Sequence, residues 1–398
     1  MDLIYTLAPP PAAGPSSIFL AGPAPRDGAP GSWRPAALGY LRARGYAGHV
    51  YVPETRDGSA APYEDQVAWE EMALNRADVI LFWVPRDMAK MPGLTTNDEW
   101  GTWKGSGKVV WGCPPAAPKT RYQLHHAKRL LVPVSSTLES TVESALNRLL
   151  QLGAPAPRTG AELEVPAHVW STASFQSWYG NLKAAGNRLD GARVEYTFRV
   201  GPGRRFIFRW CLWARVWIAA EGRHKENEIV LGRPDVSTVV LHGPAKHPAQ
   251  LRDVRVVLVR EFRTPVNNDR GRVAEPPGGS SKVSGGARSA LETAAEEVAE
   301  ETGFHLDPTR LRYLGARQIA PTLSSHCSHL YAAELTEDEM DALELEADRG
   351  VPRGVEADTE RTYLEVTTLE DLLGREDVGW ESTGQILHAV YAHSLGMT

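Results

Sequence analysis

The sequence predicts two domains: an α/β domain, with a parallel sheet flanked by helices, and then an α+β domain, with a mixed sheet between helices. Three observations predict this fold class. Strand-like apolar runs alternate with helical runs over residues 1–152, which is the pattern of βαβ units. Residues 153–167 are rich in Pro, Ala and Gly and lack periodicity, as in a linker. Over residues 168–398, strands follow one another through short turns, with few helices between them.

The elements of the first domain follow from local patterns. Short apolar runs bounded by turn residues predict strands at 17–23, 48–54, 78–85, 108–114 and 129–134. Apolar residues at helical spacing predict helices at 33–46, 63–77, 97–107 and 137–152. The lead before these elements is rich in Pro, Ala and Gly and predicts a loose segment.

The sequence pattern of the second domain is typical of a domain rich in β-strands. Apolar and β-branched runs predict strands at 205–220, 225–233, 236–244, 254–265 and 328–335. Helical spacing predicts helices at 289–303 and 384–396.

The composition excludes several classes of protein. The chain has 398 residues, 42% hydrophobic and 23% charged, as in a folded soluble protein, and its net charge of -6 argues against a general binder of nucleic acids or anionic membranes. The most apolar run, 206–218, is interrupted by Arg209 and Arg215, and the first residues lack a basic signal-peptide region. The three cysteines are scattered, without metal spacing. We therefore expect a cytoplasmic protein without a nucleic-acid or membrane partner.

The predicted helix at 289–303 crowds four glutamates, Glu296, Glu297, Glu300 and Glu301, onto two turns. Like charges at i,i+4 weaken a helix by roughly 0.2–0.5 kcal/mol per pair, so the cluster needs a compensation. A solvated acidic face, a partner surface and a site for hard divalent cations are the three alternatives, and carboxylate oxygens are the ligands that such cations prefer.

The surroundings of the acidic helix favour the cation site. An apolar strand, a basic turn and the glycine-rich segment Glu-Pro-Pro-Gly-Gly at 275–279 precede it, and glycines let backbone approach a phosphate or metal closely. This order resembles the Nudix hydrolase family over most of 230–398. The resemblance implies that Glu297, Glu300 and Glu301 hold catalytic Mg²⁺ or Mn²⁺ ions, with Glu300 and Glu301 essential for turnover.

Two charged positions depart from the family pattern. The family's Arg is Glu296 here, and the Glu expected eight residues earlier is Arg288, which suggests a swapped structural ion pair. The glycine expected at position 282 is Lys282, so the glycine-rich loop is irregular. Neither departure removes a residue that corresponds to a metal ligand.

Further residues resemble the ADP-ribose and nucleotide-sugar pyrophosphatase branch of the family. The resemblance implies that Arg260 and Arg263 contact a diphosphate and that Glu275 adds a metal or ribose contact, although surface charge is an equal alternative for both arginines. The branch also takes a base from a late acidic loop, where the candidates are Glu356, Asp358 and Glu360. The implied reaction is attack of water on a phosphorus of a nucleoside diphosphate-linked compound.

The first domain resembles the nucleoside 2-deoxyribosyltransferase-like family over about residues 16–150. The resemblance is carried by Ala21-Gly22-Pro23 after a strand, Ala77-Asp78 before a strand, and Glu99-Trp100-Gly101 at a predicted helix start. It implies that Glu99 is a nucleophile that attacks an anomeric carbon, as in retaining glycosidases. A place at a helix N-terminus favours the ionised carboxylate.

Two neighbours complete the implied site. Glu70 corresponds to a carboxylate that contacts the ligand, and Trp100 is a candidate to stack on a base. The alternatives are that Glu99 caps its helix, that Glu70 pairs with Arg76 or Lys104, and that the tryptophans belong to the core. A further aspartate that the family carries shortly before the nucleophile is absent here.

These resemblances imply a bifunctional enzyme acting on a small nucleotide or nucleoside. In one alternative, the N-terminal domain is a nucleotide sensor without catalysis. In another, the altered acidic motif makes the second domain a nucleotide-binding module. Both resembled families often assemble into oligomers, so a homo-oligomer is open as well.

Overall fold

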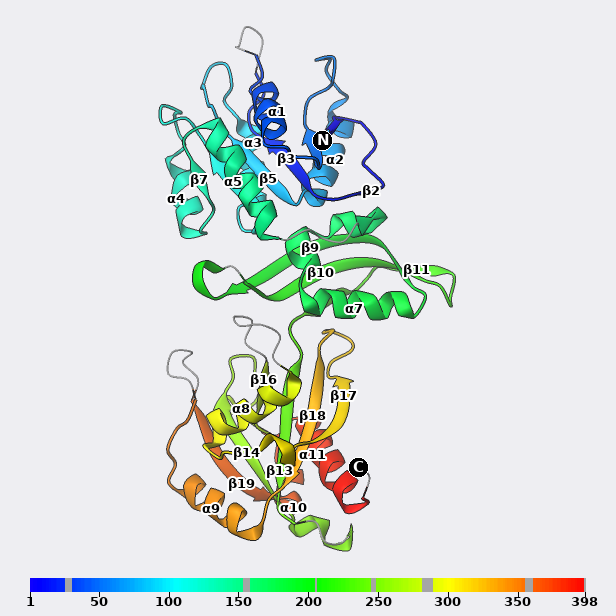
Figure 1. Cartoon of the computed structure of the whole chain (residues 1–398), viewed down its shortest axis with the longest axis vertical. Helices are drawn as coiled ribbons and strands as arrows, with labels where there is room; N and C mark the ends of the chain where they lie inside the picture. Colours follow the sequence, from blue (N-terminus) through cyan, green and yellow to red (C-terminus); the bar gives the residue numbers. More distant parts are fainter. Residues whose placement is uncertain are drawn as a thin grey trace. The chain divides into compact units, whose positions relative to one another are not determined.

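The chain forms two compact units, residues 1–232 and 233–398 (Figure 1). The computed structural model describes residues 1–25, 31–152, 158–204, 206–244, 248–280, 289–354 and 361–396. The sequence places the domain boundary at 153–167, whereas the contacts within the chain place it after Gly232. None of the helices in the described ranges is long and apolar enough to cross a membrane.

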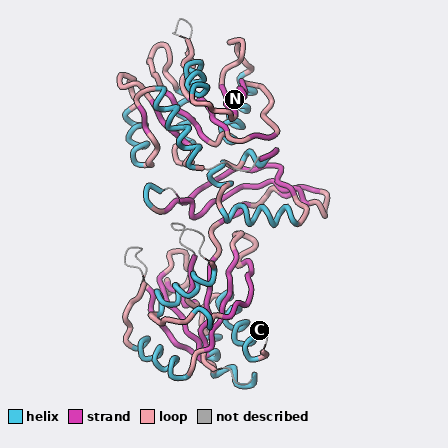
Figure 2. The backbone as a smooth tube through the Cα atoms, viewed as in Figure 1, coloured by secondary structure: helices cyan, strands magenta, loops and turns pink. Residues whose placement is uncertain are grey.

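The first unit begins with a six-stranded parallel sheet of order β1-β4-β3-β5-β6-β7. Figure 2 colours the strands of the chain magenta and its helices cyan. Its strands are β1 (Asp2–Tyr5), β3 (Ser17–Ala21), β4 (His49–Val52), β5 (Val79–Trp83), β6 (Val109–Gly112) and β7 (Val134–Ser135). The central strands are buried on both faces, as continuous apolar runs require. The predicted α/β class of this region is confirmed.

Helices cover both faces of this sheet. They are α1 (Arg34–Ala43), α2 (Tyr63–Arg76), α3 (Leu94–Trp103), α4 (Arg121–Arg129) and α5 (Leu138–Gln151). Apolar residues of α2, α3 and α4 share one core with the sheet, and apolar residues of α1 and α5 share a second core. The two cores are the two faces of a doubly wound sheet.

Two segments of this sheet differ from the sequence prediction. The loose N-terminal lead contains strand β1, which pairs in parallel with β4. The strand expected at 129–134 is largely absent, because α4 extends to Arg129 and only Val134–Ser135 pair with β6. Backbone pairing with a neighbouring strand is not visible in local periodicity, so edge strands of two to four residues escape the sequence pattern.

A second sheet follows within the first unit. Strands β9 (Arg188–Val200) and β10 (Phe206–Ile218) form a long antiparallel ribbon, and β11 (Arg223–Lys225) and β12 (Ile229–Gly232) pair with the other edge of β10. Its apolar face packs against the helices α6 (Ala167–Trp170) and α7 (Ala173–Ala184). The short strands β2 (Ala13–Gly14) and β8 (Arg158–Thr159) pair beside it, and the turn η1 (Gly160–Glu164) follows.

The second unit is a mixed seven-stranded sheet between helices. Its main path runs β15-β14-β13-β18-β17, with β16 on β13 and β19 on β14, and only β13 and β18 are parallel among the described pairs. The strands are β13 (Val236–His242), β14 (Arg255–Phe262), β15 (Arg272–Glu275), β16 (Gly278–Ser280), β17 (Arg312–Gln318), β18 (Cys327–Glu334) and β19 (Thr362–Thr368). This mixed sheet agrees with an α+β domain.

The helices of the second unit lie on opposite faces of its sheet (Figure 1). They are α8 (Ala290–Thr302), α9 (Glu337–Asp348), α10 (Leu369–Leu373) and α11 (Trp380–Ser394). Helix α8 begins with a capping box at Ser289 and ends at Gly303 in the left-handed conformation, so both ends of the acidic helix are set by local sequence.

Candidate functional site

The first sheet has a switch point at the carboxyl end of β3. The chain leaves β3 for β4 on one side and returns from β4 to β5 on the other side. In open α/β sheets, ligands bind in the crevice outside the carboxyl ends of the strands at such a point. A ligand site is therefore expected among the residues that follow β3 and β5.

A buried arginine stands at this switch point. Arg34, the first residue of α1, is 2% exposed. Its Nε donates to the carbonyl of Leu20 at 3.1 Å, and its Nη2 donates to the carbonyl of Gly22 at 2.8 Å. Its Nη1 donates to Oε1 of Glu54 at 2.6 Å. These bonds fix a cation directly behind the end of β3.

The backbone beside Arg34 leaves no room for a side chain at Gly22. Gly22 has φ of +151°, and a side-chain carbon there would come within 2.8 Å of the Trp33 ring and overlap the carbonyl of Trp83. The Trp33 indole donates to the carbonyl of Pro23 at 3.2 Å. This turn therefore admits only glycine at position 22 and brings backbone carbonyls within reach of the guanidinium.

Two carboxylates from different helices share the field of Arg34. Glu70 of α2 and Glu99 of α3 are both half-buried, and the charges of both act on the pKa of Arg34. Burial raises the pKa of Glu99 to about 8, and the charge of Glu70 adds to this effect, whereas Arg34 opposes it. Burial also raises the pKa of Glu70, against a hydrogen bond from Gln66 and the charge of Arg34. A coupled pair of carboxyl groups in a partly buried site is a common arrangement at functional sites.

The position of Glu99 in its helix differs from the sequence expectation. Helix α3 begins at Leu94 after Gly93, so Glu99 lies in the second turn and does not cap the helix. The helix dipole acts chiefly within the first turn. Burial therefore dominates, and the neutral form of Glu99 is favoured rather than the ionised form.

Glu70, Arg76 and Lys104 each have a polar partner in the structure. Glu70 accepts a hydrogen bond from Gln66 at 2.9 Å, while Arg76 pairs with Glu164 and Lys104 donates to a backbone carbonyl. The two alternative ion pairs expected for Glu70 are therefore not the ones formed.

Trp100 lies in the core, in agreement with the alternative interpretation of the tryptophans. Its side chain is 2% exposed and packs on Phe82 and Trp111, with ring centroids 5.6 and 4.6 Å away. In this structure its ring offers no open face to a base.

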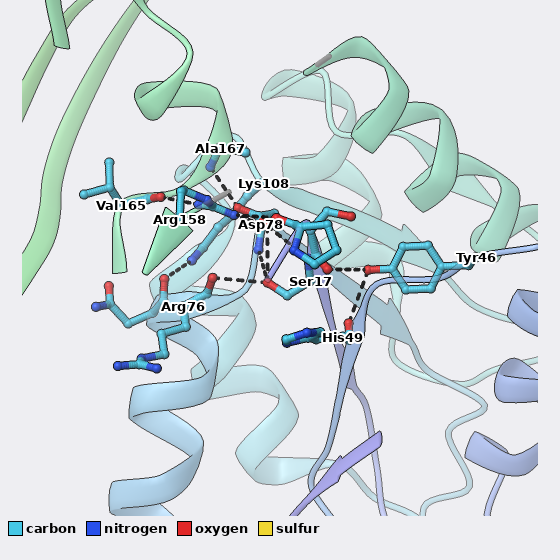
Figure 3. Close-up of polar contacts among 12 residues, drawn as sticks. Ser17, Tyr46, His49, Arg76, Asp78, Lys108, Arg158, Val165 and Ala167 are labelled. Atoms are coloured by element: carbon cyan, nitrogen blue, oxygen red, sulfur yellow. Dashed lines mark hydrogen bonds and ion pairs between the residues drawn. The ribbon is translucent and has the colours of Figure 1, made fainter. Parts of the chain in front are cut away.

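Asp78 has a structural role at the opposite, amino-terminal edge of the sheet (Figure 3). The carboxylate is fully buried and accepts bonds from the backbone NH groups of Ser17 at 2.9 Å and Ala167 at 2.8 Å. It also pairs with Arg158 at 2.7 Å, and Arg158 donates to the carbonyl of Val165. Asp78 thus joins the first sheet to the segment that follows residue 158.

In the second unit, two glutamates of α8 face the glycine-rich segment. Oε2 of Glu301 accepts a hydrogen bond from the backbone NH of Gly278 at 2.9 Å, and Glu301 is 8% exposed. Glu297 lies against Gly279, where a side-chain carbon would fall 2.5 Å from its carboxyl carbon. Burial raises the pKa of Glu301 well above its ordinary value, and Glu297 and Glu275 contribute to the rise.

The other predicted metal ligands are less enclosed. Glu300 is exposed on α8, as is Glu296. Within the described ranges, no group of three or more His, Cys, Asp or Glu side chains is placed to hold a metal ion. Glu356, Asp358 and Glu360, together with Lys282 and Arg288, lie outside the described residues.

The two arginines expected at a diphosphate have partners within the chain. Arg263 pairs with Glu261 at 2.9 Å and with Glu275 at 3.1 Å. Arg260 lies over the ring of Tyr363, with 5.9 Å between the guanidinium carbon and the ring centroid. Arg263 and Glu275 are thus brought together beside Glu301, whose charge also acts on the pKa of Arg263.

Sequence reasoning did not identify Arg34. A signal for it exists, because a cation in the first turn of a helix opposes the helix dipole. Such a residue needs another partner, and here Glu54 and two carbonyls supply it.

Comparison with known families supports the first region. Residues 15–117 match the family model described as nucleoside 2-deoxyribosyltransferase like, and no Nudix family model matches the chain. The matched segment includes Arg34, Glu70 and Glu99. No curated protein matches the chain. Residues 15–117 therefore form a nucleoside 2-deoxyribosyltransferase-like domain.

Proposed function

We propose that the N-terminal domain binds a nucleoside or nucleotide at Arg34, Glu70 and Glu99 and breaks its N-glycosidic bond. The observation that carries this proposal is that two half-buried carboxyl groups, Glu70 and Glu99, and the buried cation Arg34 act on one another's pKa at the switch point of the sheet. The family match over residues 15–117 supports the substrate class.

In the proposed mechanism, Glu99 attacks the anomeric carbon as the bond to the base nitrogen breaks. The bonding electrons leave with the base, which takes a proton from solvent or from Glu70. The resulting glycosyl ester on Glu99 is then released by water, which regenerates the carboxylate, or by a second base in a transfer reaction. Arg34 is a positioning residue, because its bonds hold the turn after β3 and its charge moderates the rise in the pKa of Glu99.

A nucleophilic Glu99 must be ionised, so the pH profile tests its role. With the pKa of Glu99 at about 8, roughly a tenth of the free enzyme carries the carboxylate at pH 7. We expect kcat/KM for base release to rise roughly tenfold between pH 7 and pH 9. A kcat/KM that falls over this interval would assign Glu99 as a proton donor instead.

The direct test is incubation with deoxynucleosides and with nucleoside monophosphates, followed by chromatography of the free base. Glu99→Ala and Glu99→Gln should reduce release by about a thousandfold, since the covalent step is lost. Asp98→Asn is the matched control, because Asp98 is the adjacent, exposed carboxylate. Release that persists in Glu99→Ala would remove the assignment, and saturable binding without release would favour the sensor.

For the second unit, we propose Mg²⁺- or Mn²⁺-dependent hydrolysis of a nucleoside diphosphate-linked compound of the ADP-ribose type. The supporting observation is the placement of Glu301 and Glu297 against the backbone of Gly278 and Gly279. This placement brings carboxylate oxygens beside a segment where backbone can approach a diphosphate.

The donor chemistry of this segment suits a hard cation. Mg²⁺ is usually bound through one or two carboxylates together with waters and substrate phosphates, so Glu297 and Glu301 are enough to hold it with a substrate present. Bound there, the ion would neutralise the diphosphate and acidify a water. Within the chain itself, the NH of Gly278 orients the Glu301 carboxylate, and Arg263 balances the charge of Glu275 and Glu261.

This second proposal is tested with a panel of nucleoside diphosphate compounds and a Mg²⁺ titration. Glu301→Gln should abolish Mg²⁺-dependent release of nucleotide, and Glu300→Gln should do the same if Glu300 is the third metal ligand that the family resemblance implies. Glu296→Gln, on the same exposed stretch of α8, is the control and should retain turnover. Unchanged turnover in Glu301→Gln would overturn the assignment, and tight binding without turnover would make the unit a binding module.

A further inference from the structure

Two guanidinium groups converge on one glycine at the amino-terminal edge of the first sheet. Arg148, in the last turn of α5, donates through Nη2 to the carbonyl of Gly107. Arg199, near the end of β9, covers the same glycine from another direction. A side-chain carbon at Gly107 would lie 2.5 Å from Cζ and 2.7 Å from Nε of Arg199. Gly107 has φ of +80°, so both the space and the backbone conformation require glycine here.

No carboxylate balances these two cations in the described part of the chain. Neither Arg148 nor Arg199 forms an ion pair there, although other arginines of the same ribbon do. Arg188 pairs with Asp190, and Arg193 pairs with Glu195. Nε and Nη2 of Arg199 are buried without a hydrogen-bond partner. Burial, together with the smaller effect of the Arg148 charge, lowers the pKa of Arg199 to about 10.

A buried histidine lies in the same positive field. His168 of α6 is 7% exposed, and its Nε2 has no hydrogen-bond partner. Burial lowers its pKa well below the ordinary value, and Arg199 and Arg148 are the largest of the nearby charges that act in the same direction. The nearby Asp78 does not compensate, because Arg158 already pairs with it at 2.7 Å.

This arrangement is costly without a further partner. Burying a charged or polar group without a hydrogen-bond partner is unfavourable, and two adjacent cations add repulsion. The place of Arg148 at a helix C-terminus, together with its backbone bond, explains that residue. Nothing within the described chain does the same for Arg199 or for Nε2 of His168. An anion would satisfy all three, and the planar fork of arginine suits phosphate oxygens in particular.

We propose that Arg148, Arg199 and His168 bind the phosphate group of a small anion beside Gly107. Gly107 precedes β6, whereas Arg34 follows β3, so this phosphate site lies at the edge opposite to the Arg34–Glu99 site of the same parallel sheet. It is therefore separate from the glycosidic site, and a phosphate there joins α5 and α6 to the end of β9.

The test measures binding of inorganic phosphate, pyrophosphate and AMP to the full chain by calorimetry and thermal unfolding, with chloride at equal ionic strength as reference. We expect saturable binding and a rise in Tm with the phosphate probes in the parent chain. Arg199→Gln and Arg148→Gln should each weaken binding of pyrophosphate at least tenfold, and Arg199→Lys should fall between them and the parent. Arg215→Gln, an exposed ribbon arginine paired with Glu226, should bind as the parent does.

The probes separate the sources of the phosphate. Equal effects of the variants on pyrophosphate and AMP indicate a site for the phosphate group alone, whereas a greater loss of AMP binding than of pyrophosphate binding indicates a nucleotide site. Without any anion, Arg199→Gln should unfold at a higher temperature than the parent, because the uncompensated charge is gone. Pyrophosphate affinities within twofold of the parent in both glutamine variants, or no saturable binding by the parent at millimolar concentration, would overturn the proposal. If Arg199→Gln does not fold, Arg148→Gln and Arg199→Lys decide it.

Discussion

The carboxylates of the two acidic sites in this chain have different surroundings. In the N-terminal domain, the charges of Glu70 and Glu99 act on a buried arginine, Arg34, that three hydrogen bonds hold in place. In the second unit, Glu301 accepts a hydrogen bond from a backbone NH, and Arg263, whose charge acts on Glu301, pairs with two other glutamates. The first site carries its own cation, whereas the second presents carboxylate oxygens to a glycine-rich backbone.

This difference has a consequence for chemistry. A fixed internal cation suits a site where one carboxyl group must change between neutral and ionised forms near neutral pH, and the pKa of Glu99 at about 8 agrees with that. Carboxylates that face glycine backbone instead suit an external cation and a phosphate. Substitutions at Arg34, at Glu99 and at the two glycines of the second site would distinguish these two arrangements.

The largest effect should follow from removal of the internal cation. Arg34→Met removes the side-chain donors to the carbonyls of Leu20 and Gly22 and the ion-pair partner of Glu54, which keeps its hydrogen bond from the hydroxyl of Ser32. We expect a loss of about 3–4 kcal/mol in the free energy of unfolding, measured by urea denaturation at pH 7. Arg44→Met is the control, because that side chain, at the opposite end of α1, forms exposed ion pairs with Glu139 and Glu143. An equal loss in the free energy of unfolding in the two variants would mean that Arg34 stabilises the fold no more than an exposed arginine does.

A smaller and pH-dependent effect is expected from Glu99→Gln. The folded chain holds the Glu99 proton more tightly than the unfolded chain, so ionisation between the ordinary pKa of 4.5 and about 8 destabilises the fold. The variant avoids this loss. Relative to the parent, it should gain about 2–3 kcal/mol between pH 4 and pH 9, after a discount for the partly exposed side chain. Urea denaturation across this range measures the gain, and a pH-independent difference would contradict the burial of Glu99.

The smallest effects concern the two glycines of the second site. A side-chain carbon at Gly278 would overlap the backbone of Ser237 and lie 3.0 Å from the Cα of Thr238, whereas at Gly279 it would meet only the mobile end of Glu297. Gly278→Ala should cost about 1–2 kcal/mol, and Gly279→Ala less than about 1 kcal/mol. Thermal unfolding compares them. Gly279→Ala should nevertheless reduce Mg²⁺-dependent turnover, because Glu297 must move, and an unchanged Mg²⁺ titration would exclude Glu297 from the site.

Local patterns predicted most of the regular elements around both sites. The strand before Gly22, helix α2 with Glu70 and helix α8 with its four glutamates lie close to their expected ranges. Helix α3 was expected from residue 97, but it begins at Leu94 and places Glu99 in the second turn. Because of this difference of three residues, burial sets the pKa of Glu99, and the dipole at the helix end does not.

The sequence by itself determined the alternation of strands and helices, the acidic helix and the identities of the candidate carboxylates, because periodicity and residue type are local properties. Only the tertiary structure decided that the charge of Arg34 acts on Glu99, that Trp100 belongs to the core and that Arg148 and Arg199 meet at Gly107. The reason is physical: burial, the charges of distant neighbours and the loss of hydrogen-bond partners arise from contacts between residues far apart in the chain, and these contacts set the pKa and the accessibility of each group.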